Sequence, residues 1–231
     1  MKDINKIKAE FERIKKLGYI KSVKPFDLKN DGAVGNTFEN ILGVKENNLR
    51  EADFDGWECK TQRQLTKSAA SLFTRKPDSP KYADTYMREN WGINDPSGEY
   101  PHIKVFRTSI YANEWRTVYE KYKIKLIVDE KNLILRIVLC DLNGKLLDNS
   151  VFWNFESLEK ASQKLKNTLV VKAEEKLIGC FSKKVHFKFI SCKVFVGFKF
   201  EKLIDLIKVG RARYDHRLGI YRTGKYKGRK H

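Results

Sequence analysis

The chain reads DFDGWECKT from residue 53 to residue 61, an acidic turn followed by a strand-like alternation. Gly56 and the aspartates beside it are typical of a turn, and the residues after it alternate between apolar and polar side chains. We therefore expect Trp57 and Cys59 on the buried face of a strand. Glu58 and Lys60 should share the opposite face, because strand side chains repeat every two residues.

This stretch combines two carboxylates and a lysine that together suit phosphodiester hydrolysis. That reaction needs a hard cation, and Mg²⁺ prefers oxygen ligands. Asp53 and Glu58 can converge on one ion with the carbonyl of Cys59 between them, while Lys60 orients the water or stabilises charge on the phosphate. The spacing alone also fits a solvated edge strand, because 33% of the residues are charged. Asp55 lies near Glu58 too, and we expect it to cap the turn.

Upstream of the strand, residues 35–43 read GNTFENILG and have the apolar spacing of a short helix between two glycines. Phe38, Ile41 and Leu42 form its buried stripe, so Glu39 should face away from that stripe. A first amphipathic helix is expected from about residue 3 to residue 17, ending at Gly18.

Several segments in fixed order resemble the MvaI/BcnI restriction endonuclease family, in the MutH-like branch of the PD-(D/E)XK nucleases. They are G-x-T-F-E at 35–39, L-G-V at 42–44, E-N at 46–47, D-x-x-G-x-E-x-K-T at 53–61, A-x-S-L-F-T at 69–74, D-N-S-V-x-W-x-F-x-S-L at 148–158 and G-x-Y-x-x-G-K at 219–225. The resemblance thus spans nearly the whole chain. It implies an α/β fold with a central mixed β-sheet flanked by helices, and it assigns catalytic roles to Glu39, Asp53, Glu58 and Lys60.

The resemblance also implies a monomeric type II restriction endonuclease that hydrolyses duplex DNA at a short specific site and leaves 5′-phosphate ends. The expected cofactor is Mg²⁺, for which Mn²⁺ can substitute. A catalytic lobe is expected over residues 1–175 and a recognition lobe over residues 176–231. In relatives an aspartate and an arginine before the glycine- and lysine-rich tail read base edges in the major groove, and here these are Asp215 and Arg217. The alternative for this pair is an ordinary surface ion pair.

Relatives that resemble this chain continue past the position of His231, so the sequence leaves the target site open. Two other functions are also possible: a MutH-like mismatch-repair nicking endonuclease and a DNA-binding module without catalysis. The second alternative leaves four correctly ordered catalytic residue types unexplained.

The chain carries a formal net charge of +18, which indicates a polyanionic partner such as double-stranded DNA, although a lysine-rich composition is the plain alternative. The candidate phosphate contacts are Arg63, Lys67, Arg75, Lys76, Arg222 and Lys225. No signal peptide or apolar run of membrane-spanning length is present, so we expect a cytoplasmic protein with no membrane partner. The four cysteines form no C-x-x-C pair, and we interpret them as buried structural thiols rather than zinc ligands.

Farther along the chain, periodicity predicts a three-stranded meander, then a helix, a β-rich stretch and a last helix before the basic tail. The expected ranges are 122–128, 133–140 and 146–153 for the strands, 157–165 for the helix, 169–196 for the β-rich stretch and 200–207 for the last helix.

Overall fold

The computed structural model describes residues 3–26, 30, 32–43, 54–66, 68–180, 182–222 and 226–230. The chain divides into two compact units, Met1–Phe73 with Ala161–Lys199 and Thr74–Lys160 with Phe200–His231. This division differs from the lobes expected at 1–175 and 176–231. Residue 175 lies inside strand β10 (Asn167–Ile178), which is hydrogen-bonded on both sides to strands of the first unit. The chain therefore crosses between units at three points, and none of them has the composition of a linker.

The first unit contains a mixed four-stranded sheet in the order β1-β11-β10-β2. Its other strands are β1 (Ile20–Lys21), β2 (Glu58–Arg63) and β11 (Lys184–Val196). β10 runs parallel to β2 and antiparallel to β11, and β1 pairs antiparallel with β11. The parallel register sets Thr168 opposite Glu58 and Val170 opposite Lys60.

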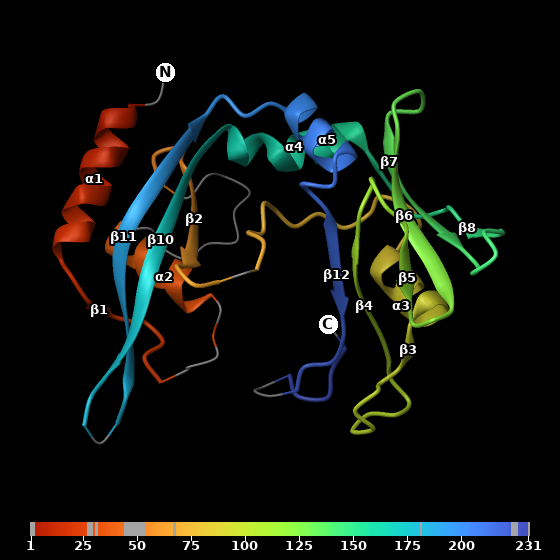
Figure 1. The fold of residues 1–231 in the computed structure, drawn as a ribbon, viewed down its shortest axis with the longest axis horizontal. Coiled ribbons are helices and arrows are strands. Elements are labelled where there is room, and N and C mark those ends of the chain that lie inside the picture. Colours follow the sequence, from red (N-terminus) through yellow and green to blue (C-terminus); the bar gives the residue numbers. More distant parts are fainter. Residues whose placement is uncertain are drawn as a thin grey trace. The chain divides into compact units, whose positions relative to one another are not determined.

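Helices α1 (Ile4–Lys16) and α2 (Ala33–Ile41) pack on one face of this sheet, with α1 beside β11 and α2 beside β2 (Figure 1). Both helices confirm the sequence prediction. Asp3 caps α1 by accepting hydrogen bonds from the backbone N–H groups of Asn5 and Lys6. The shared core includes the edge-to-face pair Phe38–Phe189, whose ring centroids lie 4.9 Å apart. The two helices and this core therefore cover one face of the sheet, and Glu58 and Lys60 lie on the opposite face of β2.

The second unit contains two sheets, one in the order β12-β4-β3 and one in the order β5-β6-β7-β8 with β9 also paired to β7. The strands are β3 (Ile93–Asn94), β4 (Lys104–Ile110), β5 (Arg116–Val118), β6 (Tyr122–Asp129), β7 (Ile134–Cys140), β8 (Leu146–Asp148), β9 (Phe152–Asn154) and β12 (Tyr214–Leu218). The expected single strand over 146–153 is split into β8 and β9. Asp148 ends β8 because its carboxylate accepts from both the backbone N–H and the hydroxyl of Ser150, which turns the chain.

The remaining helices are α3 (Ala83–Trp91), α4 (Phe155–Ser162) and α5 (Phe200–Lys208), with a 3₁₀ turn η1 (Gln163–Lys166) after α4. The helix expected over 157–165 is thus an α-helix that ends in a 3₁₀ turn, and the last helix is confirmed. Cys180 is exposed, so the expectation that it is buried was wrong; it follows Gly179 in the connection between β10 and β11, where no sheet covers it. Among the described residues, no helix is long and apolar enough to cross a membrane.

Candidate active site

The turn before β2 is closed by two backbone hydrogen bonds between Phe54 and Trp57, of 3.0 and 2.7 Å. Asp55 and Gly56 occupy its two central positions with φ values of 45° and 75°, the left-handed region that a primed two-residue turn requires. The Asp55 carboxylate accepts a hydrogen bond from the Lys6 ammonium at 3.1 Å, so it is held against α1. Asp53 lies outside the described residues, and its part in metal binding stays a prediction.

The two faces of β2 have different surroundings. Trp57 and Cys59 belong to the core, as predicted. Glu58 and Lys60 share the opposite face, and yet Glu58 is only 1% exposed. A solvated edge strand with an exposed glutamate, the plain alternative, therefore does not describe this segment.

Two ammonium groups contact the same oxygen of Glu58. Lys60 Nζ lies 2.6 Å and Lys164 Nζ lies 2.9 Å from Oε1. Oε2 is buried and has no hydrogen-bond partner among the described residues. No sequence pattern links Lys164 to Glu58, because the two are far apart in the chain and only the parallel pairing of β2 with β10 brings η1 to the start of β2.

The surroundings of Glu58 fit a hard divalent cation. A buried carboxylate oxygen without a partner is costly, and oxygen ligands are what Mg²⁺ prefers. Glu58 can supply such a ligand through Oε2. Asp53 and the carbonyl of Cys59 remain the other predicted ligands.

Glu39 is half-buried on α2, the helix that packs beside β2. Gly35, one helical turn earlier, approaches β2 so closely that a Cβ placed on it would lie 3.2 Å from Thr61 Oγ1 and 3.8 Å from Glu39 Oε1. The glycine therefore lets α2 set the Glu39 carboxylate beside Thr61, the residue after Lys60. The sequence placed Glu39 on the correct helix face, and the packing of α2 on β2 decides which residue it approaches.

The predicted base-reading pair lies on β12, in the sheet with β4 of the second unit. Asp215 accepts hydrogen bonds from Ser109 Oγ and from Arg217 Nε, both at 2.7 Å. Burial raises the pKa of Asp215, but the two hydrogen bonds and the nearby charges of Arg217 and Arg213 together hold the pKa below its usual value. The carboxylate is therefore charged at neutral pH, and the Arg217 side chain remains 74% exposed.

Two further arginines extend this face of the sheet. Arg107 on β4 lies directly opposite Arg217 in the antiparallel register, and Ser109 lies opposite Asp215. Arg213 stacks over the ring of Tyr111, 5.5 Å from its centroid. Arg107 is far from Asp215 in the chain, and only the pairing of β4 with β12 aligns it with Arg217. Arg213 lies two residues before Asp215, so strand alternation alone could have placed it on the same face.

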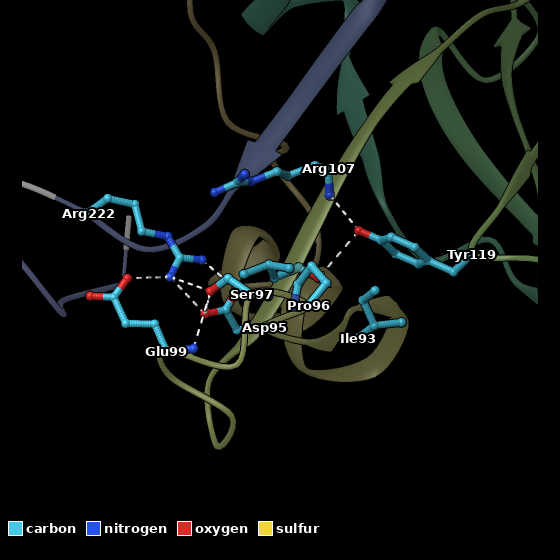
Figure 2. A pocket seen from close by; sticks show the side chains of 9 residues that line it. Ile93, Asp95, Pro96, Ser97, Glu99, Arg107, Tyr119 and Arg222 are labelled. Atoms are coloured by element: carbon cyan, nitrogen blue, oxygen red, sulfur yellow. Dashed lines mark hydrogen bonds and ion pairs between the residues drawn. The ribbon is translucent and has the colours of Figure 1, made fainter.

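Arg222 belongs to a separate network in the second unit (Figure 2). Its guanidinium binds Asp95 and Glu99. Arg222 also lines a pocket of about 390 Å³, together with Arg107 and Tyr119. The hydrogen bond from Arg222 is the main cause that holds the pKa of Asp95 far below its usual value, against the effect of burial. Arg222 thus ties the C-terminal tract to the loop that follows β3.

The other predicted phosphate contacts are paired with carboxylates. Arg63 binds Glu175, Arg75 binds Asp78, and Lys76 lies 3.2 Å from Asp84. Lys67 and Lys225 lie outside the described residues. Lys172, which the sequence analysis did not single out, donates to the neutral Gln62 Oε1 at 2.6 Å on the strand face that carries Glu58 and Lys60. Its positive charge is therefore not balanced by this partner.

Comparison with known proteins gives a consistent result. Residues 8–231 match the sequence model of the MvaI/BcnI restriction endonuclease family. The chain is similar to a solved complex of restriction endonuclease MvaI with its cognate DNA substrate, with 29% identity, a TM-score of 0.88, and coverage of 100% of this chain and 90% of that one. It is also similar to MvaI in the absence of DNA, with 29% identity, a TM-score of 0.57, and coverage of 100% and 91%. No curated protein sequence matches the chain.

Proposed function

This chain belongs to the MvaI/BcnI restriction endonuclease family, and we propose that Asp53, Glu58 and Lys60 are the residues with which it cuts DNA. As a member of that family it is a type II restriction endonuclease, a hydrolase that acts on double-stranded DNA at a specific site. The expected fold is confirmed by the similarity to the MvaI structures.

One observation carries the assignment of the cutting residues: the buried Glu58 carboxylate is bonded to Lys60 on the sheet face away from the core. Burying an unpaired charge costs roughly several kcal/mol. A cluster of charged side chains on this face is therefore more consistent with a catalytic role than with a purely structural one. The Lys60 ammonium can donate a hydrogen bond to an attacking water or to a phosphate oxygen brought to this face. Glu39, beside Thr61, is proposed to orient the same groups.

The proposed reaction is hydrolysis at phosphorus. The water oxygen forms a bond to phosphorus, the bond from phosphorus to the 3′-oxygen breaks, and the products are a 5′-phosphate and a 3′-hydroxyl. When held by Glu58, Asp53 and the Cys59 carbonyl, Mg²⁺ would neutralise phosphate charge and lower the pKa of the water, and Mn²⁺ can replace it.

We expect Lys60→Ala and Glu58→Gln to lower the rate of cleavage by about 100-fold or more. The first removes the ammonium group that acts on the phosphate, and the second removes a charged ligand of the metal ion. Asp53→Ala should do the same, and Glu39→Ala should have a smaller effect. The measurement is cleavage of a mapped linear DNA with Mg²⁺, Mn²⁺ or EDTA, followed by sequencing of the ends. The control is Lys166→Ala, an exposed lysine of η1.

The same experiment separates the alternatives. Fragments cut in both strands at one repeated site support the restriction activity, whereas nicks alone support the MutH-like alternative. Full cleavage in EDTA, or by the Lys60→Ala protein, contradicts the assignment. DNA binding without any cleavage by the wild type supports a non-catalytic module.

For recognition we propose that the exposed face of β4 and β12 reads base edges in the major groove, which admits a two-stranded ribbon. Arg217 suits the paired acceptors of guanine, and the charged Asp215 can accept from the amino group of cytosine. Arg107 lies on the same face beside Arg217 and adds a third reading side chain. The first unit is then the catalytic lobe and the second unit the recognition lobe.

We also propose that the enzyme acts as a monomer, since one chain carries both the cutting cluster and the reading face. Sedimentation of the protein with and without a cognate duplex tests this. A complex with two chains per duplex contradicts it.

A further inference from the structure

Glu58 has one more positive partner than the family's carboxylate and lysine pattern accounts for. Lys60 comes from the pattern itself, whereas Lys164 comes from η1 and lies 2.9 Å from the same oxygen. Both lysine side chains are largely buried, with 21% and 23% of their surface exposed. Two like charges so close together repel, and the carboxylate between them is what offsets this repulsion.

The position of Lys164 follows from the topology of the sheet. η1 leads directly into β10, and Thr168 of β10 lies opposite Glu58 in the parallel register. Leu165 is buried and anchors the turn, and the carbonyl of Lys166 accepts a hydrogen bond from the backbone of Phe198. Lys164 is therefore presented to Glu58 by a fixed segment of backbone.

The two oxygens of Glu58 differ in their surroundings. Oε1 receives both ammonium groups, while Oε2 is buried and without a partner in the described part of the chain. A side chain held through Oε1 has a defined orientation, and Oε2 remains available for another cation. The same two ammonium groups repel any cation that approaches.

We propose that Lys164 is a positioning residue that neutralises and orients Glu58 before the metal ion binds, so that the ion must bind against its positive charge. This inference rests on the proposed metal site at Glu58. Lys164 thereby sets the concentration of ion that the enzyme requires, while Lys60 remains the ammonium that acts on the phosphate.

The test is titration of the DNA-free protein with Mn²⁺, followed by electron paramagnetic resonance or calorimetry, for the wild type, Lys164→Met and Lys164→Arg. Met keeps the volume and removes the charge, so we expect it to bind Mn²⁺ about tenfold more tightly, since a nearby positive charge no longer opposes the ion. Lys164→Arg restores the charge and should return the affinity toward that of the wild type. Lys166→Met, which removes an equal charge from the same turn without a contact to Glu58, is the matched control.

A second measurement keeps the proposal testable if the Met variant folds poorly. In EDTA, Lys164→Met should unfold at a lower temperature than the wild type, because Glu58 has lost a counter-ion, and Mn²⁺ should raise its unfolding temperature by more than it raises that of the wild type. Lys164→Gln serves as the second neutral variant.

The outcomes distinguish two failures. If Mn²⁺ binds equally to the wild type and to Lys164→Met, and Glu58→Gln abolishes binding, the metal site stands and the role of Lys164 is wrong. If Mn²⁺ binds to the wild type and to Glu58→Gln alike, or to neither, the metal site at Glu58 is wrong and this proposal fails with it. Weaker binding to Lys164→Met also overturns the proposal.

Discussion

Arg107 and Arg217 lie opposite each other on neighbouring strands, and both side chains are exposed. Like charges directly opposite in a sheet are destabilising, and Asp215 compensates only one of them. An arrangement that weakens the isolated fold is consistent with a surface that receives an anionic partner. Arg217 and Asp215 form a surface ion pair, and this pair orients the Arg217 guanidinium toward Asp215.

We expect Arg217→Ala to cost about 1–3 kcal/mol of discrimination at one base pair, because a guanidinium bound to two guanine acceptors is lost. Arg107→Ala should relax the preference at an adjacent base pair. The measurement is cleavage of the cognate site and of its single-base variants at one salt concentration. Lys172→Ala is the comparison, since loss of a phosphate contact weakens binding to all sequences alike. If both arginine variants keep the full preference ratio, recognition lies elsewhere in the protein.

At the scale of the element, successive residues of β12 point to opposite faces. Asp215 and Arg217 are exposed on one face, and His216 is buried on the other. His216 is packed against Phe106 and Tyr214, and its Nδ1 lies 2.9 Å from the Tyr214 hydroxyl. Burial lowers the pKa of His216 to about 4, although Asp84 and Asp215 act in the opposite direction. β12 is therefore anchored by a histidine that is neutral in the folded protein at neutral pH.

Because of His216, we expect the free energy of unfolding to depend on pH. Between the unfolded pKa of 6.5 and the folded value of about 4, the unfolded chain binds a proton that the folded chain does not. The contribution of His216 to the free energy of unfolding is therefore fully present above pH 6.5. As the pH falls from 6.5 toward 4, this contribution decreases by about 1.4 kcal/mol for each pH unit.

We expect His216→Phe to reduce this slope, because phenylalanine keeps an aromatic side chain and does not titrate. Urea unfolding of the wild type and the variant at several pH values between 6.5 and about 5 measures it. His102→Gln, at an exposed site, is the control and should leave the slope unchanged. Equal slopes for the wild type and His216→Phe would show that His216 is not the group responsible.

At the scale of the whole molecule, a net charge of +18 predicts DNA binding that depends steeply on salt, with log K falling by about 0.9 per neutralised phosphate for each unit of log salt. Several of the predicted phosphate contacts are ion-paired with carboxylates, which changes which side chains we expect to contribute to this salt dependence. Lys172 has a neutral partner on the strand face of Glu58, whereas Arg63 is already balanced by Glu175.

We therefore expect Lys172→Ala to reduce the salt slope by about 1, and Arg63→Ala to leave it nearly unchanged. The measurement is binding to a cognate duplex in metal-free buffer over a range of salt concentrations. If Arg63→Ala reduces the salt slope and Lys172→Ala does not, Arg63 is the phosphate contact that the sequence predicted and the role of Lys172 is wrong. An affinity that does not depend on salt would contradict phosphate-driven binding altogether.

The sequence by itself determined the features that depend on neighbours in the chain. Periodicity located α1, α2 and α5, and the alternation after Gly56 placed Cys59 in the core and Glu58 with Lys60 on the other face. The ordered motif identified the family, and with it the kind of reaction.

Only the tertiary structure decided the features that depend on pairing between distant segments. The two compact units divide the chain elsewhere than at residue 175, because hydrogen bonds on both sides of β10, which have no local signature, keep that strand in the first unit. Lys164 joins Glu58, and Arg107 joins Arg217, through strand registers that no single segment encodes. The charge of Arg63 is balanced by Glu175 for the same reason. Local sequence thus fixed which chemical groups are present and which face each occupies, and long-range pairing fixed which charges meet.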